Sequence, residues 1–272
     1  ADDDLTSNAG NIILTAGNDV TIGGTLDSSN NIDAEATAGS VIQAAGQNML
    51  AGNDVMLDAG TAVTLNGTIG AVTPIGGNIL VGNAIVPATV DASGAWDAVG
   101  YVDVQGDAIT VADITAAGNN VGVGINLNAQ AGDIVSNGVL DTSAGTGSVV
   151  LTATGGITVE DDVLSATDID MTADTGDIAI NGSVLDAQGG SITIEATLGS
   201  IVQDGANDML ATVDVNLDAA TAVVLDGTIG FGAPIGNDVM INQNLLTLGA
   251  VSVNGSITAN GDVFISSDTT VD

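Results

Sequence analysis

The sequence predicts an all-β protein folded as a right-handed parallel β-helix (β-solenoid) of about twelve coils, each about 20–24 residues long. Three observations support this fold class. Apolar residues alternate with polar ones in short segments, the segments recur at a nearly constant spacing, and a long stretch of the chain is duplicated. Parallel strands joined by crossovers are right-handed in nearly all proteins, which gives the expected handedness.

Each unit consists of short alternating segments separated by turn residues, as in GNIILTAGNDVTIGGTL from Gly10. Alternation with a period of two is typical of a strand that buries one face, and Asn-Gly, Asn-Asp and Gly-Asp pairs favour turns. Three such strands in about 23 residues fit one coil of a solenoid. In one representative coil we expect the inward side chains to be Val55, Leu57, Val63, Leu65 and Ile69.

The first strand of each unit recurs along the whole chain, in twelve units. An up-and-down barrel or a sandwich, the alternative fold, explains the near-constant spacing of these units poorly. Twelve coils stacked at the strand spacing of about 4.8 Å form a rod about 58 Å long. The predicted starts are Ile12, Ile32, Val55, Ile79, Val102, Ile125, Val149, Ile169, Ile192, Val215, Val239 and Val263. Their successive numbers differ by 20, 23, 24, 23, 23, 24, 20, 23, 23, 24 and 24.

Residues 32–81 and 192–241 form an internal duplication, in which the numbers of equivalent positions differ by 160. Between Ser40–Val81 and Ser200–Ile241, 21 of 42 aligned positions are identical. The offset spans seven of the shorter units, so the duplication copies whole coils. We therefore expect residues 1–272 to form a single continuous solenoid.

Residues 82–101 interrupt the regular pattern and predict at most one irregular coil. This region ends with Trp96 and Tyr101, the only Trp and Tyr of the chain. Clustered aromatic residues can mark an interface, so both are candidates for a lateral contact. The alternative is that they fill a gap in the core.

The charge of the chain is entirely acidic. It contains 34 Asp and Glu and no Lys, Arg or His, which gives a formal net charge of −34. Phosphate backbones are bound mainly through Lys and Arg, so we expect no nucleic-acid partner. No apolar run approaches the roughly 18 residues of a membrane span, so we expect no membrane insertion.

The composition also limits catalysis. Without His or Cys the chain has no Ser-His-Asp triad, thiol nucleophile or tetrahedral zinc site. Carboxylates alone hydrolyse glycosides in some β-solenoids, and the obvious acidic clusters of this chain are Asp161-Asp162 and Asp2-Asp3-Asp4. A sugar-cleaving solenoid usually needs long loops that build a cleft, and the uniform coil length leaves little room for them. We therefore expect no enzyme, with an acid-only glycoside hydrolase as a remote alternative.

Aspartates recur where strands begin, as in the GNDV and NGDV segments. Stacked on successive coils, such carboxylates could bind Ca²⁺ or another divalent cation. The alternative is that Asp and Asn serve as turn formers with loosely held ions, because neither a calcium-binding nonapeptide nor an EF-hand loop occurs. We expect no other cofactor. The weak metal candidates are Asp19, Asp54, Asp238 and Asp262.

The two ends of the chain read as if they could be joined. Asp272 followed by Ala1 gives TTVD–ADDDLTSNAG, which is similar to TVEDDVLSATDID from Thr158. The alternative is a chance match in a low-complexity sequence. The partner we expect is therefore the protein itself, as a covalent tandem array or a head-to-tail stack. The predicted subunit contacts are Ile12 and Leu14 on the first coil and Val263 and Ile265 on the last.

Repeats such as GSVVLTATGGITV and GSITIEATLGSIVQ resemble those of filamentous-haemagglutinin-type adhesins, large repetitive surface proteins of bacteria. The resemblance covers nearly the whole chain but lies in the style of the repeat. It implies a right-handed parallel β-helix and a secreted structural rod attached to the cell surface.

Because the chain has no Lys or Arg, trypsin-type proteases have no cleavage site in it.

Together these features predict a structural extracellular filament or adhesin stalk whose units are joined coaxially by β-augmentation or as tandem repeats. The alternative is a bacterial surface adhesin that binds a specific ligand along one face.

Overall fold

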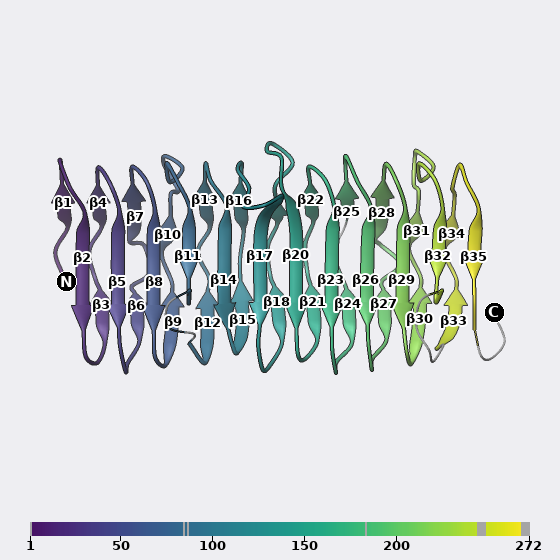
Figure 1. Ribbon diagram of the computed structural model, residues 1–272, viewed down its shortest axis with the longest axis horizontal. Helices are drawn as coiled ribbons and strands as arrows, with labels where there is room; N and C mark the ends of the chain where they lie inside the picture. Colours follow the sequence, from purple (N-terminus) through teal and green to yellow (C-terminus); the bar gives the residue numbers. More distant parts are fainter. Residues whose placement is uncertain (1, 84, 86, 183, 244–248, 268–272) are drawn as a thin grey trace.

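The computed structural model describes residues 2–83, 85, 87–182, 184–243 and 249–267. They form one rod built from three parallel sheets, with the N-terminus at one end and the C-terminus at the other (Figure 1). No helix capable of crossing a membrane occurs in this described part of the chain. The junction of Asp272 with Ala1 lies outside the described residues.

The chain visits the three sheets in a fixed order, A, then B, then C. Sheet A contains β1 (Leu5–Ser7), β4 (Leu26–Ser28), β7 (Asn48–Ala51), β10 (Thr68–Ile69), β13 (Trp96–Ala98), β16 (Ile114–Ala116), β19 (Leu140–Asp141), β22 (Val163–Ser165), β25 (Val184–Ala187), β28 (Asp208–Ala211), β31 (Thr228–Ile229) and β34 (Ser256–Ile257). Sheet B contains β2 (Ile12–Ala16), β5 (Ile32–Ala36), β8 (Val55–Ala59), β11 (Ile79–Val81), β14 (Val102–Gly106), β17 (Val123–Ala129), β20 (Ser148–Ala153), β23 (Ile169–Ala173), β26 (Ile192–Ala196), β29 (Val215–Ala219), β32 (Val239–Ile241) and β35 (Val263–Ile265). Sheet C contains β3 (Val20–Ile22), β6 (Val41–Gln43), β9 (Ala62–Leu65), β12 (Thr89–Ala92), β15 (Ala108–Val111), β18 (Ile134–Ser136), β21 (Ile157–Val159), β24 (Ile178–Ile180), β27 (Ile201–Gln203), β30 (Ala222–Leu225) and β33 (Ala250–Val253).

These sheets make a right-handed parallel β-solenoid, as predicted. The 12, 12 and 11 strands of the three sheets amount to eleven complete coils and two further strands. In Figure 1 the chain runs down the near side along sheet B, returns upward on the far side and advances from the N-terminus to the C-terminus. That sense of rotation is right-handed, in agreement with the general preference of parallel crossovers.

The strand register confirms the spacing of the twelve predicted positions, ten of which begin their strands, whereas β17 begins at Val123 and β20 at Ser148, just before the predicted Ile125 and Val149. Each start lies directly opposite the start in the following coil, from Ile12 opposite Ile32 to Val239 opposite Val263. Because a slip of one residue would turn the apolar set outward, alternation along each strand is enough to fix this register.

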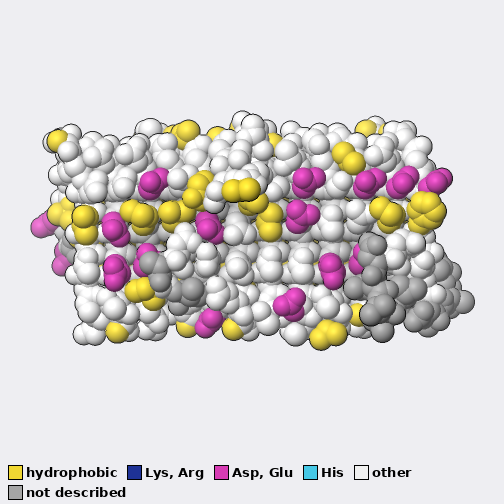
Figure 2. All heavy atoms as spheres, in the orientation of Figure 1, with side chains coloured by type: hydrophobic (Ala, Val, Ile, Leu, Met, Phe, Trp, Pro, Cys, Tyr) yellow, Lys and Arg dark blue, Asp and Glu magenta, His cyan; other side chains and the backbone are white. Residues whose placement is uncertain are grey.

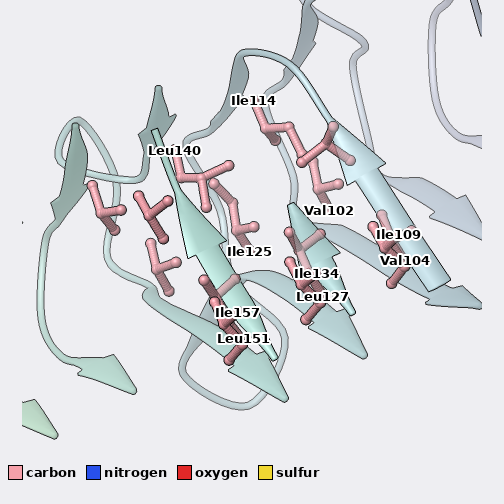
Figure 3. Close-up of a cluster of buried hydrophobic side chains, with 14 of the residues drawn as sticks. Val102, Val104, Ile109, Ile114, Ile125, Leu127, Ile134, Leu140, Leu151 and Ile157 are labelled. Atoms are coloured by element: carbon pink, nitrogen blue, oxygen red, sulfur yellow. The ribbon is translucent and has the colours of Figure 1, made fainter. Parts of the chain in front are cut away.

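The core is a set of aliphatic columns that run along the rod axis. The five inward side chains predicted for one coil, Val55, Leu57, Val63, Leu65 and Ile69, are all 0% exposed. In Figure 3 the side chains of neighbouring coils, among them Val102, Ile125 and Ile134, point into the same interior. Burying one such aliphatic side chain stabilises a fold by about 1.5–3 kcal/mol, so a narrow interior of Val, Ile, Leu and Ala suffices.

The constant spacing holds for sheet B but not for the other sheets. In sheet A the register partners Ile69 and Trp96 differ by 27 in residue number, whereas the next partners, Trp96 and Ile114, differ by 18. The longer connections project from the rod as loops (Figure 1), including residues 70–76 and 230–236. Of the predicted irregular region 82–101, residues 84 and 86 lie outside the described residues, and its remainder supplies β12 and β13.

Candidate functional site

The two ends of the rod carry the four predicted subunit contacts. Ile12 and Leu14 lie on β2, and Val263 and Ile265 lie on β35, the terminal strands of sheet B. All four occupy inward positions of the apolar columns. Val239 is 0% exposed within the rod, whereas Val263, one coil further, is 45% exposed. The column of buried side chains therefore continues to the end of the rod and is open there.

The backbone at these ends follows the same rule as in the interior. The first inward residue of each sheet-B strand donates its N–H to the next coil: Ile12 to the Asn31 carbonyl at 2.9 Å, and Val239 to the Asp262 carbonyl at 3.0 Å. Val263 occupies the same position in its strand as Ile12 and Val239, so its N–H points forward along the rod, away from β32. Among the described residues this N–H has no acceptor. The end thus presents a strand edge, and such edges pair readily with another strand.

The aspartates that precede sheet-B strands form a hydrogen-bonded ladder between coils. The Asp54 carboxylate accepts the Asn78 N–H at 2.8 Å. Further along the rod, Asp214 accepts the Asp238 N–H at 3.0 Å and Asp238 accepts the Asp262 N–H at 2.7 Å. These bonds satisfy turn N–H groups that the sheets leave unpaired, which gives Asp and Asn at this corner a structural role.

The structure places the four metal candidates on two different corners of the coil. Asp54, Asp238 and Asp262 belong to the ladder before sheet B, whereas Asp19 precedes sheet C and accepts the Ser40 N–H at 2.9 Å. Within the described residues no group of three or more Asp, Glu, His or Cys side chains is positioned to hold a metal ion.

Acidic and apolar side chains share the outer face of sheet B, which Figure 2 shows as a row of magenta and yellow groups. Burial raises the pKa of Asp33, and repulsion by Asp58 and Glu35 raises it further. Burial and the negative charge of Asp168 likewise raise the pKa of Asp170, whereas a hydrogen bond with Thr193 lowers it. Because the chain has no Lys, Arg or His, no basic side chain offsets the repulsion between these carboxylates.

The two aromatic residues have different environments. Trp96 is 1% exposed and lies in the core on β13, between Ile69 and Ile114. The lateral contact predicted for Trp96 is therefore corrected: its side chain fills the interior beside the long loop of residues 70–76. Tyr101 is partly exposed before β14, where burial, followed by Asp103 and Asp54, raises the pKa of its phenol.

The projecting loops create shallow hollows on sheet A, which the uniform spacing of sheet B did not predict. Two of them occupy equivalent places in the duplication. One, of about 350 Å³, is lined by Asp186, Leu210, Phe231 and Pro234, and the other, of about 340 Å³, by Asp27, Leu50 and Pro74. Each combines one carboxylate with apolar walls.

Asp161-Asp162 is one of the two acidic clusters on which the remote hydrolase alternative depends. The Asp162 carboxylate accepts the Val184 N–H at 2.9 Å, and that of Asp161 accepts the Asp162 N–H at 2.8 Å. Neither residue lines the hollows of sheet A described above. Both carboxylates therefore act as turn acceptors.

Two buried glutamines were not predicted from the sequence. Gln43 and Gln203 are 0% exposed and end equivalent sheet-C strands. The Gln43 amide donates to the carbonyls of Gln47 and Thr68 at 3.2 and 3.1 Å, and the Gln203 amide donates to those of Asn207 and Thr228 at 3.0 and 3.4 Å. The signal that could have revealed them is a polar residue kept at an inward position in both copies of the duplication.

When the chain is compared with known proteins, no family model, no curated protein and no solved structure matches it. The resemblance to haemagglutinin-type repeats therefore stays a prediction from the sequence.

Proposed function

We propose that this protein is a unit of a structural extracellular filament or adhesin stalk, in which the solenoid continues coaxially from one unit into the next. The observation that supports the proposal is the open apolar column at the C-terminal end of the rod, where the exposed fraction of the side chain rises from 0% at Val239 to 45% at Val263. A strand edge of this kind can pair with the first coil of another unit.

The strand register supports a direct joint between units. If Ala1 of one unit followed Asp272 of another, the step in residue number from Val263 to the next Ile12 would be 21, and that from Ile257 to the next Leu5 would be 20. The first value lies inside the range of 20–24 found between sheet-B starts, and the second equals the step from Met49 to Ile69 in sheet A. In such a joint the Val263 N–H donates to the Asn11 carbonyl of the next unit.

The test is electron microscopy of the purified chain, with variants at the open edge. Val263→Pro removes the forward-facing N–H, and Pro is tolerated as the first residue of a strand. Val263→Ile is the matched control, because Ile occupies this column at Ile192 and Ile169. We expect fibres from the wild type and the control and short rods from Val263→Pro. Fibres of equal length from all three proteins would contradict β-augmentation at this end.

Covalent joining needs a separate measurement. Mass spectrometry of native material would detect a peptide that spans Asp272 and Ala1 if the units are tandem repeats of one polypeptide. A free Ala1 amine in full stoichiometry would contradict covalent joining.

A ligand-binding adhesin is the second candidate, favoured by the paired hollows on sheet A. Seven coils separate them, or about 34 Å at the usual strand spacing, so the rod would present two equivalent sites. Saturable binding of cell-surface material that Leu210→Asp and Leu50→Asp abolish would support this function. Binding that both variants leave intact would contradict it.

A further inference from the structure

The ladder of hydrogen bonds at the corner before sheet B has a gap that begins at Tyr101. Asn78 still continues the ladder, because its side-chain oxygen accepts the Tyr101 N–H at 3.1 Å. The Tyr101 side chain accepts no backbone N–H among the described residues, and the ladder resumes at Asp168, which accepts the Ser191 N–H at 2.8 Å. A tyrosine thus occupies a position at which the preceding coils carry Asn or Asp. At this coil the fold gives up an interaction that its neighbours keep.

The next coil differs as well, by a hairpin in the connection that leads into β17. Asn120 and Val123 exchange backbone hydrogen bonds at 2.7 and 3.0 Å, in the only antiparallel pairing among the described residues. Val121 and Gly122 between them have φ angles of 53° and 93°, as a type I′ turn requires. A β-branched residue at positive φ is a genuine outlier, so the turn keeps Val121 in a conformation that costs free energy.

Hydrogen bonds hold this hairpin in place. The Gly122 carbonyl accepts the Ser148 N–H of the following coil at 2.8 Å. The Asn119 side chain accepts the Gly122 N–H at 3.1 Å and donates to the Thr146 hydroxyl. The hairpin is therefore fixed before any ligand arrives, and a ligand that contacts it would not have to order it.

Tyr101 and the hairpin enclose a hollow of about 160 Å³ on the outer face of sheet B, and its lining includes Asp103, Asn120 and Asn126. Asp103 and Asn126 are register partners on β14 and β17. The Asn126 amide N–H donates to the Asp103 carboxylate at 2.9 Å, so the oxygen of that amide and the second carboxylate oxygen remain as acceptors. Neither of these two oxygens has a hydrogen-bond partner within the described part of the chain.

The chemistry of the hollow favours a cationic ligand. Burial raises the pKa of the Tyr101 phenol, and the negative charges of Asp103 and Asp54 raise it further. The ring therefore stays neutral at physiological pH, beside carboxylates that attract positive charge. A guanidinium group carries a positive charge and five N–H donors in one plane, which stacks on aromatic rings and pairs with a carboxylate through two hydrogen bonds.

We propose that the hollow beside Tyr101 binds the guanidinium group of an arginine side chain that a partner protein or peptide presents, with the Tyr101 ring against its plane and Asp103 as its counter-ion. The chain has no Lys, Arg or His, so the cation comes from another molecule. A volume of about 160 Å³ is below the roughly 300–1,000 Å³ of pockets for larger ligands, and it suits a single side chain. The hollow lies on the side of the rod, so this inference goes beyond axial joining and does not depend on it.

The experiment follows the Tyr101 ring by NMR spectroscopy, because Tyr101 is the only tyrosine of the chain, while acetyl-arginine methylamide is added to the full protein. We expect saturable shifts that weaken as sodium chloride is raised, since salt screens charges. The citrulline counterpart, which has a neutral urea group in place of the guanidinium group, should bind at least tenfold more weakly. Shifts that do not saturate, or equal binding of the citrulline compound, would overturn the proposal. Saturation by neutral methyl glycosides without binding of the arginine compound would overturn it in favour of a sugar site.

A pair of charge variants tests whether the binding is local. Asp103→Asn removes the proposed counter-ion at nearly constant shape and should weaken the binding of the arginine compound at least fivefold. The matched control, Asp170→Asn, removes the same charge from the outer face of sheet B three coils away, and should leave the affinity within twofold of the wild type. Equal losses in the two variants would show that only the overall charge attracts the ligand, and would overturn the proposal.

A second pair of variants tests the ring, with the backbone N–H of Val123 on the hairpin as the NMR signal. Tyr101→Phe keeps the aromatic ring and should bind like the wild type. Tyr101→Asn introduces the residue type that Asn78 has at the same corner of the preceding coil, so we expect it to fold normally, which circular dichroism would verify. Its affinity for the arginine compound should fall at least fivefold. Equal affinity in the two variants would overturn the role of the Tyr101 ring.

Discussion

The two copies of the duplication, residues 32–81 and 192–241, can be compared position by position within the same rod. Val55 and Leu57 of the first copy correspond to Val215 and Leu217 of the second, and all four are 0% exposed. Outward positions differ between the copies: Met56 of the first copy corresponds to Asn216 of the second. Packing between coils constrains the inward positions, whereas solvent accepts many side chains at the outward ones.

A glycine with a positive φ angle also stands at the same turn in both copies. Gly70 and Gly230 begin the projecting loops with φ angles of 77° and 83°, a conformation that side chains other than glycine adopt only with strain. The loops themselves have diverged, with Ala71 in one copy and Phe231 in the other. The duplication therefore separates residues that the fold needs from residues that are free to acquire another role.

The largest effect should come from a second pair of equivalent glycines. A Cβ on Gly67 would collide with the Gln47 carbonyl, and a Cβ on Gly227 with the Asn207 carbonyl. Gly67→Val and Gly227→Val should each destabilise their coil by about 3 kcal/mol, because the neighbouring backbone must shift. Thermal unfolding followed by circular dichroism measures this.

The control for these variants is Gly17→Val, since nothing lies within 4 Å of a Cβ built there. It should unfold close to the wild-type temperature. A loss of stability as large as that of Gly67→Val would show that the collision is not the cause.

The buried glutamines should behave alike in the two copies. Gln43→Ala and Gln203→Ala each remove an amide that donates to two carbonyls and leave a cavity, which should cost about 2 kcal/mol. Hydrogen exchange at the flanking strands reports the change coil by coil. If only one copy loses protection, the equivalence of the two glutamines is refuted.

A charge difference between the copies gives a smaller, pH-dependent effect. Asp33 of the first copy has Thr193 as its counterpart, and the pKa of Asp33 is raised by burial, Asp58 and Glu35. A raised pKa means that the folded state holds the proton more tightly than the unfolded state does. This contribution to stability is present below the usual Asp pKa of about 3.9 and is lost as pH rises through the folded-state pKa.

Asp33→Thr should therefore increase stability at neutral pH and reduce the loss of stability on going from pH 4 to pH 7. Denaturant unfolding at both pH values measures the difference, and Thr15→Ser on the outer face of the same sheet serves as a neutral control. An unchanged pH dependence in Asp33→Thr would mean that the Asp33 carboxylate is not destabilising.

The smallest effect is expected at the loops. Phe231 is 65% exposed, so Phe231→Ala, which makes this loop resemble that of Ala71, should change stability by no more than about 0.5 kcal/mol. Thermal unfolding again provides the measurement. A larger loss would indicate that Phe231 packs against the rod.

The sequence was enough to predict much of the fold because the inward positions follow a period of two. The register of all twelve predicted positions and the burial of the five inward residues from Val55 to Ile69 are confirmed, although β17 and β20 begin slightly earlier than predicted. The aspartates at strand starts are metal candidates in the sequence, with turn formation as the alternative, and the structure shows their carboxylates accepting the N–H groups of the next coil, as Asp54 does from Asn78. That bond joins residues 24 positions apart, and no local pattern predicts it.

The sequence by itself determined the coil, its repeat and its apolar interior, because alternation along a strand decides which side chains are buried. Only the tertiary structure decided what depends on stacking: the burial of Trp96, the hollows beside the long loops, the ladder between coils and the hollow beside Tyr101. Each of these depends on how the length of a turn places one coil above the next. Turn length is local in the sequence, but its effect appears only when the coils are stacked.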